Sequence, residues 1–173
     1  MSNVSMSNTR RLVTIAFLIG IEVVLTRFLS IQTDFLRIGF GFLPVACVGI
    51  LFGPLWAGAA YAVGDVLGML IFPSGSYFPG FTASAFLIGC IYGLFLHKKN
   101  SSILRILIPV LLVCLGVNLF LDTLWLNILY GQAYLALLPL RAIKCAVMVP
   151  IQVVLIKLIW DKVLKRFESG LQE

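Results

Sequence analysis

The sequence predicts an all-α integral membrane protein with six transmembrane helices in a single domain. Of its 173 residues, 61% are hydrophobic and only 12% are charged, and the mean hydropathy is +1.07. These values lie outside the range of soluble domains. Apolar runs close to the roughly 20 residues that cross a bilayer core recur along the chain. No linker, low-complexity tract or internal repeat divides it, so residues 1–173 are expected to form one domain.

Six apolar runs make up the expected spans, at residues 12–30, 39–52, 54–72, 80–96, 103–130 and 137–164. Gly53-Pro54 supplies the turn between the second and third runs, because glycine and proline interrupt helices. The second run is short and is expected to be tilted or irregular. Glu22 and Arg27 interrupt the first run and no small-residue cleavage site follows it, so a cleaved signal peptide is not expected.

The cations predict the orientation, because cytoplasmic loops carry an excess of Lys and Arg. Six spans place nine of the thirteen basic residues on one side of the membrane: Arg10, Arg11, Lys98, Lys99, Arg105, Lys157, Lys162, Lys165 and Arg166. This side is therefore expected to be cytoplasmic, with both termini on it.

Four cations remain at or near the outer ends of the spans: Arg27, Arg37, Arg141 and Lys144. Charges at membrane depth are costly unless they are paired or functional. Either these side chains snorkel to lipid headgroups, or they converge on an outer cavity that binds an anion. Arg141 and Lys144 are three residues apart and share a helix face. The topology rule disfavours cations on this side of the membrane. The presence of four of them there therefore favours the anion-binding cavity.

Polar residues also occur inside the spans. Asn118, Asp122 and Trp125 follow the spacing i, i+4, i+7, which places them on one face of an α-helix. They either hydrogen-bond to neighbouring helices or line a polar cavity, and the spacing leaves both interpretations open. Asp65 and Glu22 are isolated acids, more typical of partners for inward-facing bases than of a proton relay.

The connection between the third and fourth spans has an unusual composition. Residues 72–81 contain two prolines, two glycines and four aromatic residues, and no charge. Proline and glycine stop helices and fix turns, and aromatic rings offer flat faces. The segment is suited to closing over a flat organic ligand.

Small residues recur every fourth position in two spans, as Ala60, Gly64 and Gly68 and as Ala85, Gly89 and Gly93. Such stripes let helix backbones approach closely in lipid, and both are interpreted as internal packing. Ala16 and Gly20 form a shorter version in the first span, which either packs internally or contacts a separate membrane partner.

Several chemistries are excluded. The chain has no phosphate-binding loop of the G-x-x-x-x-G-K-[ST] type and no arrangement of residues typical of an enzyme. The topology explains the basic excess, so nucleic acid is not an expected partner. Four cysteines stand isolated within spans, where small buried side chains are expected and not a disulfide or metal site: Cys47, Cys90, Cys114 and Cys145. A binding module or a facilitator without metal or cofactor is predicted.

The chain resembles a known family, the substrate-binding S components of energy-coupling-factor (ECF) vitamin transporters. General motifs of that family match residues 37–44, 51–54 and 64–68. A longer match, residues 72–86 and 91–96, is similar to its folate-specific members. The resemblance implies a six-helix S-component bundle in a bacterial cell membrane, whose outer loops cover the vitamin. It also implies a transmembrane coupling (T) protein and two ABC-type ATPases as partners, with Ala16 and Gly20 docking the T protein.

Folate as ligand fits the residues noted above. Its rings would stack on aromatic side chains, for which the candidates are Phe40, Tyr77, Phe78, Phe81 and Trp125. Its glutamate carboxylates would pair with the outer cations, drawn from Arg27, Arg37, Arg141 and Lys144. Asn118 and Asp122 would meet the pterin edge. An S component for another vitamin, a stand-alone organic-anion facilitator and a structural scaffold are the alternatives.

Overall fold

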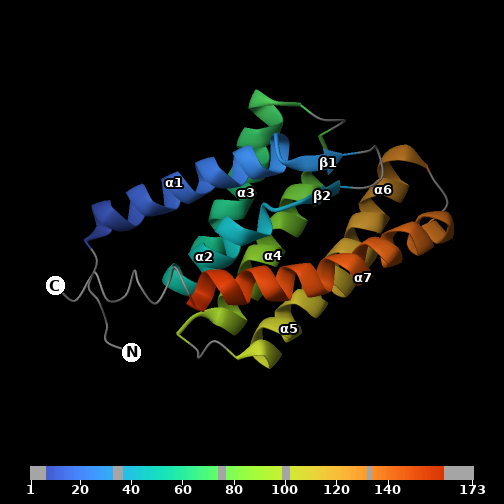
Figure 1. The fold of residues 1–173 in the computed structure, drawn as a ribbon. Helices are drawn as coiled ribbons and strands as arrows, with labels where there is room; N and C mark the ends of the chain where they lie inside the picture. The colour runs from blue at the N-terminus through green and yellow to red at the C-terminus, as the bar shows by residue number, and fades with distance from the viewer. Residues whose placement is uncertain (1–6, 33–36, 74–76, 99–101, 132–133, 162–173) are drawn as a thin grey trace.

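The computed structural model describes residues 7–32, 37–73, 77–98, 102–131 and 134–161. Within these ranges the elements are α1 (Asn8–Arg27), β1 (Ser30–Gln32), β2 (Arg37–Gly39), α2 (Phe42–Phe52), α3 (Pro54–Ile71), α4 (Pro79–Leu96), α5 (Ile103–Leu111), the π-helix η1 (Leu112–Leu121), α6 (Asp122–Tyr130) and α7 (Tyr134–Ile159). Since α5, η1 and α6 follow one another without a break, the helices correspond to the six predicted spans (Figure 1).

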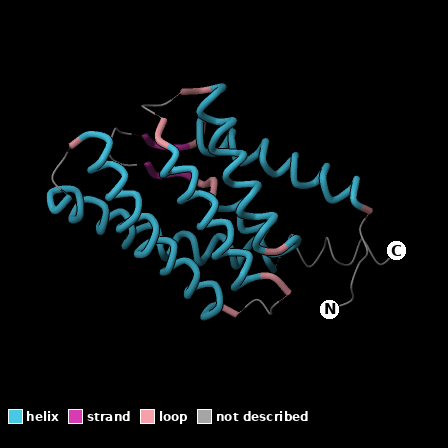
Figure 2. The backbone as a smooth tube through the Cα atoms, turned by 180° about the vertical axis from the view of Figure 1, so that it is seen from behind, coloured by secondary structure: helices cyan, strands magenta, loops and turns pink. Residues whose placement is uncertain are grey.

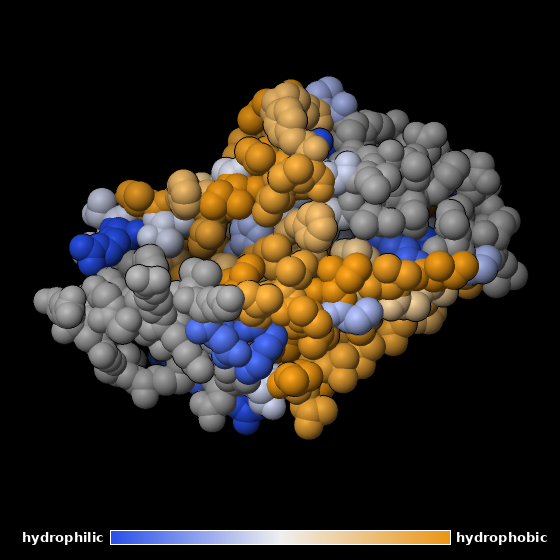
Figure 3. All heavy atoms as spheres, viewed as in Figure 1, coloured by the Kyte–Doolittle hydropathy of each residue, from blue (hydrophilic) through white to orange (hydrophobic). Residues whose placement is uncertain are grey.

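Four described helical stretches are long and apolar enough to cross a membrane: Pro54–Ile71, Pro79–Leu96, Ile103–Leu129 and Arg141–Ile159. The apolar helix α2 is shorter, as predicted, and α1 carries charged residues among its apolar ones. Large apolar side chains point outward, with Leu55 73% and Leu70 75% exposed. Figure 3 shows a broad hydrophobic surface across the middle of the molecule. The chain is a multi-pass membrane protein.

The connection between the first two helices departs from the purely helical prediction. Helix α1 ends at Arg27, and the next residues form strand β1, which pairs antiparallel with β2 in the register Ser30↔Gly39, Ile31↔Ile38 and Gln32↔Arg37. A Cβ on Gly39 would lie 2.8 Å from the Ser30 Cβ, so the ribbon needs glycine there. Strand pairing in this ribbon supplies hydrogen bonds to backbone N–H and C=O groups that lie beyond the ends of the helices. The first span therefore ends earlier, and α2 begins later, than predicted.

The helices form a bundle with two distinct ends. In Figure 1, α1 begins and α7 ends on the left, whereas the junction of α6 with α7 lies on the right. Figure 2, from behind, places both strands at the same end of the bundle as the last turn of α3. The strands β1 and β2, the last turn of α3 and the end of α6 thus lie toward one end of the bundle.

Helices α3 and α4 pack with their backbones in contact. A Cβ on Gly89 would lie 2.3 Å from the Ala57 carbonyl oxygen, and one on Gly93 would lie 2.3 Å from the Pro54 Cα. Ala60 and Ala85 are buried along the same pair of helices. The predicted role of both small-residue stripes in internal packing is confirmed. Gly53 has φ +92°, a conformation that favours glycine, and forms the predicted turn before α3.

The other glycines of the α3 stripe accommodate charged side chains of α1. A Cβ on Gly64 would lie 2.2 Å from the Glu22 Oε2, and a Cβ on Gly68 would lie 2.7 Å from the Arg27 Nε. Glu22 is only 3% exposed. Glycine at these two positions of α3 therefore leaves the space that the Glu22 and Arg27 side chains occupy.

Candidate functional site

Polar side chains from α4 and α6 meet inside the bundle. The indole Nε1 of Trp125 donates to Ser84 Oγ at 3.1 Å, and the Ser84 hydroxyl is hydrogen-bonded to the Asp122 carboxylate. Ser84 is 2% exposed. The second carboxylate oxygen of Asp122, Oδ1, is buried and has no hydrogen-bond partner among the described residues. Because a buried acceptor without a partner is costly, this oxygen is a candidate contact for a ligand.

Two cations of α7 lie near this carboxylate. Arg141 and Lys144 both interact electrostatically with Asp122. Arg141 is only 6% exposed, and its Nη1 donates to the Asn118 carbonyl oxygen and to Thr123 Oγ1, each at 3.0 Å. A buried guanidinium requires such partners to offset the loss of hydration. The predicted shared face of Arg141 and Lys144 therefore turns toward η1 and α6.

The π-helix changes which residues share a face. In a π-helix the hydrogen bonds join residues five apart, and such segments often occur at functional sites. The Asn118 side-chain amide donates to the Val113 carbonyl oxygen at 3.2 Å, five residues back on its own helix. The predicted stripe assumed α-helical spacing throughout. Asp122 and Trp125 do meet, at Ser84, whereas the described bond of the Asn118 side chain stays within η1.

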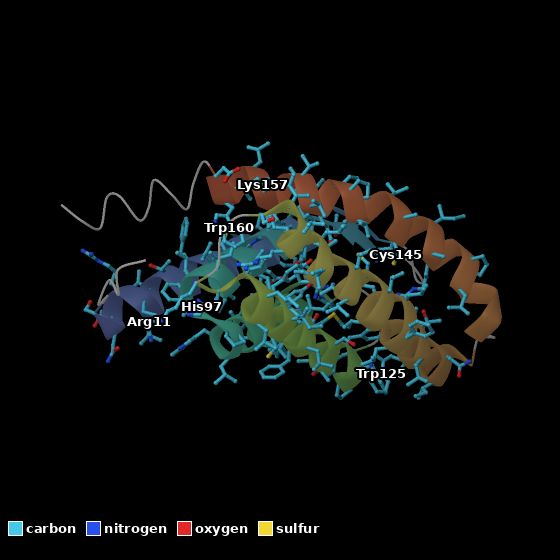
Figure 4. The ribbon with its side chains drawn as sticks, turned by 90° about the horizontal axis from the view of Figure 1, so that it is seen from below. Arg11, His97, Trp125, Cys145, Lys157 and Trp160 are labelled. Atoms are coloured by element: carbon cyan, nitrogen blue, oxygen red, sulfur yellow. The ribbon has the colours of Figure 1, made fainter. Side chains whose placement is uncertain are left out.

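Three predicted aromatic residues gather beside these polar groups. The ring centroids of Phe78 and Trp125 are 5.6 Å apart, and those of Phe78 and Phe81 are 6.2 Å apart. A Cβ on Gly80 would lie 2.5 Å from the Phe78 ring and 2.6 Å from the Trp125 ring. This glycine therefore allows the two rings to approach the start of α4. In Figure 4, Trp125 lies at the end of the molecule remote from Arg11.

A second hydrogen-bonded chain joins α3 to the start of α4. Thr82 Oγ1 donates to Asp65 Oδ2 at 2.8 Å, and the Tyr77 hydroxyl lies 3.2 Å from the same Thr82 oxygen. Asp65 also interacts electrostatically with Asp122. Tyr77 is 50% exposed, which places it at the surface, away from the buried carboxylate.

Sequence reasoning missed three hydroxyl residues of this region: Thr82, Ser84 and Thr123. Thr82 and Ser84 lie within the segment matched to the folate-specific members, but a hydroxyl among apolar residues is not distinctive. Thr123 is fully buried and follows Asp122 directly. The signal that could have identified Thr123 is its position in the same helical turn as Asp122, an acid within an apolar span.

The remaining predicted residues lie elsewhere or lack a described side chain. Phe40 is 41% exposed and packs near Phe42, with centroids 6.5 Å apart. Arg27 lies against Gly68 of α3, on a different part of the bundle from the cations of α7. Arg37 belongs to β2, but its side chain lies outside the described residues, as do residues 74–76 of the aromatic segment. Convergence of all four outer cations stays a prediction.

Ala16 and Gly20 form part of an exposed surface on α1. A Cβ on Gly20 would meet no atom within 4 Å. Internal packing is therefore not the role of this pair within the described residues, and contact with a partner stays a prediction. The four cysteines are free thiols in the structure, of which Cys114 and Cys145 are buried. These two are isolated in the sequence but not in space, because Cys145 Sγ donates to the Cys114 carbonyl oxygen at 3.1 Å.

Comparison with known proteins identifies the family. The profile described as "ECF transporter, substrate-specific component" matches residues 10–160. The chain is 49% identical over 158 residues to the folate transporter FolT of Clostridium novyi (strain NT), covering 91% of this chain and 92% of the relative. It is 37% identical over 153 residues to the folate transporter FolT of Leuconostoc mesenteroides, covering 84% and 82%.

Solved structures agree with this assignment. A crystal structure of FolT bound with folic acid superposes with a TM-score of 0.86 at 42% identity, covering 90% of this chain and 95% of that one. A more distant S component of a bacterial ECF transporter, at 23% identity and a TM-score of 0.55, shares the fold over 96% of this chain and all of the other. The chain belongs to the family of substrate-specific (S) components of ECF transporters.

Proposed function

We propose that this chain is the folate-binding S component of an ECF-type importer in a bacterial cell membrane. The observation that carries the proposal is the likeness of 90% of the chain to a FolT structure that holds folic acid. The local chemistry supports it, because an aromatic group adjoins a buried carboxylate with an open acceptor oxygen. Folate combines flat rings with hydrogen-bond donors and two carboxylates, so it suits both features.

In this proposal the ring system of folate stacks against the aromatic group of Phe78, Phe81 and Trp125. Stacked aromatic pairs contribute on the order of 1 kcal/mol beyond the area that they bury. The free oxygen of Asp122 accepts N–H groups from the pterin edge. Asn118 lies one turn earlier and supplies a further polar contact, while Tyr77 and Phe40 lie nearer the surface and close over the ligand.

The glutamate tail is proposed to meet cations at the outer end of the bundle. Its two carboxylates would form charge-assisted hydrogen bonds, for which Arg27, Arg37 and Lys144 are the proposed donors. Lys144 supports this proposal because it is half-buried and on the same helix as Arg141, three residues further along.

The proposed orientation places both termini in the cytoplasm and the β1–β2 end outside. Uptake then requires a T protein, which docks at Ala16 and Gly20, and two ATPases that supply the energy. The alternatives are an S component for another vitamin and an organic-anion facilitator. A facilitator would equilibrate folate across liposomes without partners, whereas an S component would bind folate and transport it only in the complete complex with ATP.

The test is folate binding to the purified chain, followed by quenching of tryptophan fluorescence, with riboflavin and thiamine as comparators. Tight, saturable binding of folate alone is expected. Absence of folate binding by a helical, monodisperse protein would refute the vitamin assignment.

Asp122→Asn tests the ring site directly. The substitution keeps the shape but replaces an acceptor oxygen by an NH₂ donor. A hydrogen bond to a charged group contributes about 1.5–3 kcal/mol, so folate affinity is expected to fall roughly 10- to 100-fold. Asp161→Asn is the matched control, since Asp161 pairs with Lys157 at 3.0 Å on the surface near the end of α7. Equal affinities for the two variants would contradict the assignment of Asp122.

A further inference from the structure

Helix α7 contacts carbonyl groups of the π-helix at two successive turns. Arg141 Nη1 donates to the Asn118 carbonyl oxygen at 3.0 Å. One turn further along α7, Cys145 Sγ donates to the Cys114 carbonyl oxygen at 3.1 Å, one turn earlier in η1. We name this set of contacts the η1–α7 seam. Both donors and both acceptors come from neighbouring helices, so the seam fixes one helix against the other.

The arginine contact lies where the π-helix changes to α-helix. Nη1 of Arg141 also donates to Thr123 Oγ1 at 3.0 Å, and the Thr123 hydroxyl in turn donates to the Leu119 carbonyl oxygen. Within a membrane every backbone carbonyl must find a partner in the protein, and a change of helical register disturbs that pairing. Arg141 thus bonds to residues on both sides of the junction, directly next to Asp122.

The burial of Arg141 argues against a role at the surface. Its side chain lies on the buried face of α7 that also contains Cys145, Met148 and Gln152. One guanidinium nitrogen is already bonded to two acceptors, and the charge is offset by Asp122. An arginine with a rigid fork of donors suits this task better than a lysine does.

We propose that Arg141 is a positioning residue for the folate site and does not hold the glutamate tail. Its guanidinium holds the η1–α6 junction, so that Asp122 and Trp125 face Ser84 and the ring system of the ligand. This inference rests on the proposed function and replaces the sequence-based assignment of Arg141 to the tail. It assigns to Lys144, three residues further along α7, the direct contact with an anion.

Two ligands separate the roles: folate, and pteroate, which is folate without its glutamate. If Arg141 positions the ring site, Arg141→Lys weakens both ligands by the same factor, about tenfold or more. If Arg141 binds the tail, the variant weakens folate and leaves pteroate unchanged. Lys144→Gln is the comparator and is expected to weaken folate alone. An Arg141→Lys variant that loses affinity for folate but keeps wild-type affinity for pteroate would overturn the inference.

Thr123 provides a second test that leaves the charges intact. Thr123→Val removes the hydroxyl that accepts from Arg141 and keeps the side-chain shape, whereas Thr123→Ser keeps the hydroxyl. Equal losses of folate and pteroate in Thr123→Val, restored in Thr123→Ser, are expected. Wild-type affinity in Thr123→Val would contradict the proposal.

A local readout distinguishes positioning from a general loss of stability and does not need a ligand. With Trp125 as the sole tryptophan, Arg141→Lys and Thr123→Val are expected to shift its emission. With Trp160 as the sole tryptophan, emission is expected to stay constant, because Trp160 is buried near the other end of α7 (Figure 4). Shifts at both tryptophans, or at neither, would overturn the inference. If the wild-type protein bound neither ligand, the proposed function would fail while this readout still tested Arg141.

Discussion

The α3–α4 pair and the η1–α7 seam are two ways of joining helices within one bundle. In the first, glycines remove side chains, so that Gly89 and Gly93 bring α4 against the backbone of α3. In the second, side chains remain, and Arg141 and Cys145 donate to the carbonyl groups of η1. The first contact depends on the absence of side chains, whereas the second depends on the hydrogen bonds that particular side chains donate. We refer to these two helix contacts as the α3–α4 joint and the η1–α7 joint. The candidate ligand residues lie beside the η1–α7 joint.

This difference follows from what each joint must provide. Close packing in lipid needs small residues, because the hydrophobic effect does not drive apolar helices together there. A binding site needs polar groups that stay available for a ligand, and these must be held in place by other polar groups. Asp122 fits this requirement, because Ser84 hydrogen-bonds to its carboxylate while its Oδ1 atom has no hydrogen-bond partner among the described residues.

Gly89→Ala is expected to have the largest effect, because it breaks the α3–α4 joint. The new Cβ would lie 2.3 Å from the Ala57 carbonyl oxygen, and the contacted atom belongs to the backbone and cannot rotate away. Overpacking of this kind costs about 1–3 kcal/mol and occasionally more. The midpoint of thermal unfolding of the purified chain should fall clearly. Gly20→Ala is the control, since no atom lies within 4 Å of its added Cβ; an equal loss in both variants would contradict this view of the joint.

Tyr92→Phe is expected to have an intermediate effect, on stability alone. The Tyr92 hydroxyl donates to Gln152 Oε1 at 3.1 Å and so connects α4 to α7 deep in the bundle, where both residues are buried. Leaving the amide oxygen with only the weak thiol donor of Cys114, 3.7 Å away, costs about 1–3 kcal/mol. Thermal unfolding should begin at a lower temperature, while the affinity for folate measured well below that temperature stays unchanged. A large loss of affinity would show that this bond between α4 and α7 also positions the ligand-binding residues.

The two joints also differ in how far the sequence predicts them. Glycine and alanine at every fourth position indicate close helix packing by themselves, and the stripes that end in Gly68 and Gly93 were interpreted correctly. The turn at Gly53-Pro54 was equally predictable from the sequence, since the backbone geometry of a turn restricts the residues that fit. The membrane class followed from composition, because apolar surface must face lipid.

The polar joint was predicted only in part. Asp122 and Trp125 were recognised as candidates, but the π-helix was not, because its sequence is as apolar as that of an ordinary span. Within it, the Asn118 side-chain amide bonds to the Val113 carbonyl oxygen, and the Asn118 carbonyl oxygen accepts from Arg141. The β1–β2 ribbon was missed for a related reason, since strands of three residues leave little periodicity.

Tyr77→Phe is expected to have the smallest effect, and it complements Tyr92→Phe. The Tyr77 hydroxyl is 3.2 Å from Thr82 Oγ1 but is half-exposed, so water replaces the lost hydrogen bond at little cost. Thr82 keeps its own bond to Asp65, which leaves the α3–α4 joint intact. Thermal stability should therefore match the wild type, while folate affinity falls by no more than about tenfold, since a typical net hydrogen bond contributes about 0.5–1.5 kcal/mol. If Tyr77→Phe instead destabilised the protein as much as Tyr92→Phe does, the surface end of α4 would be part of the structural core, and the separation of a packing joint from a ligand-facing joint would no longer hold.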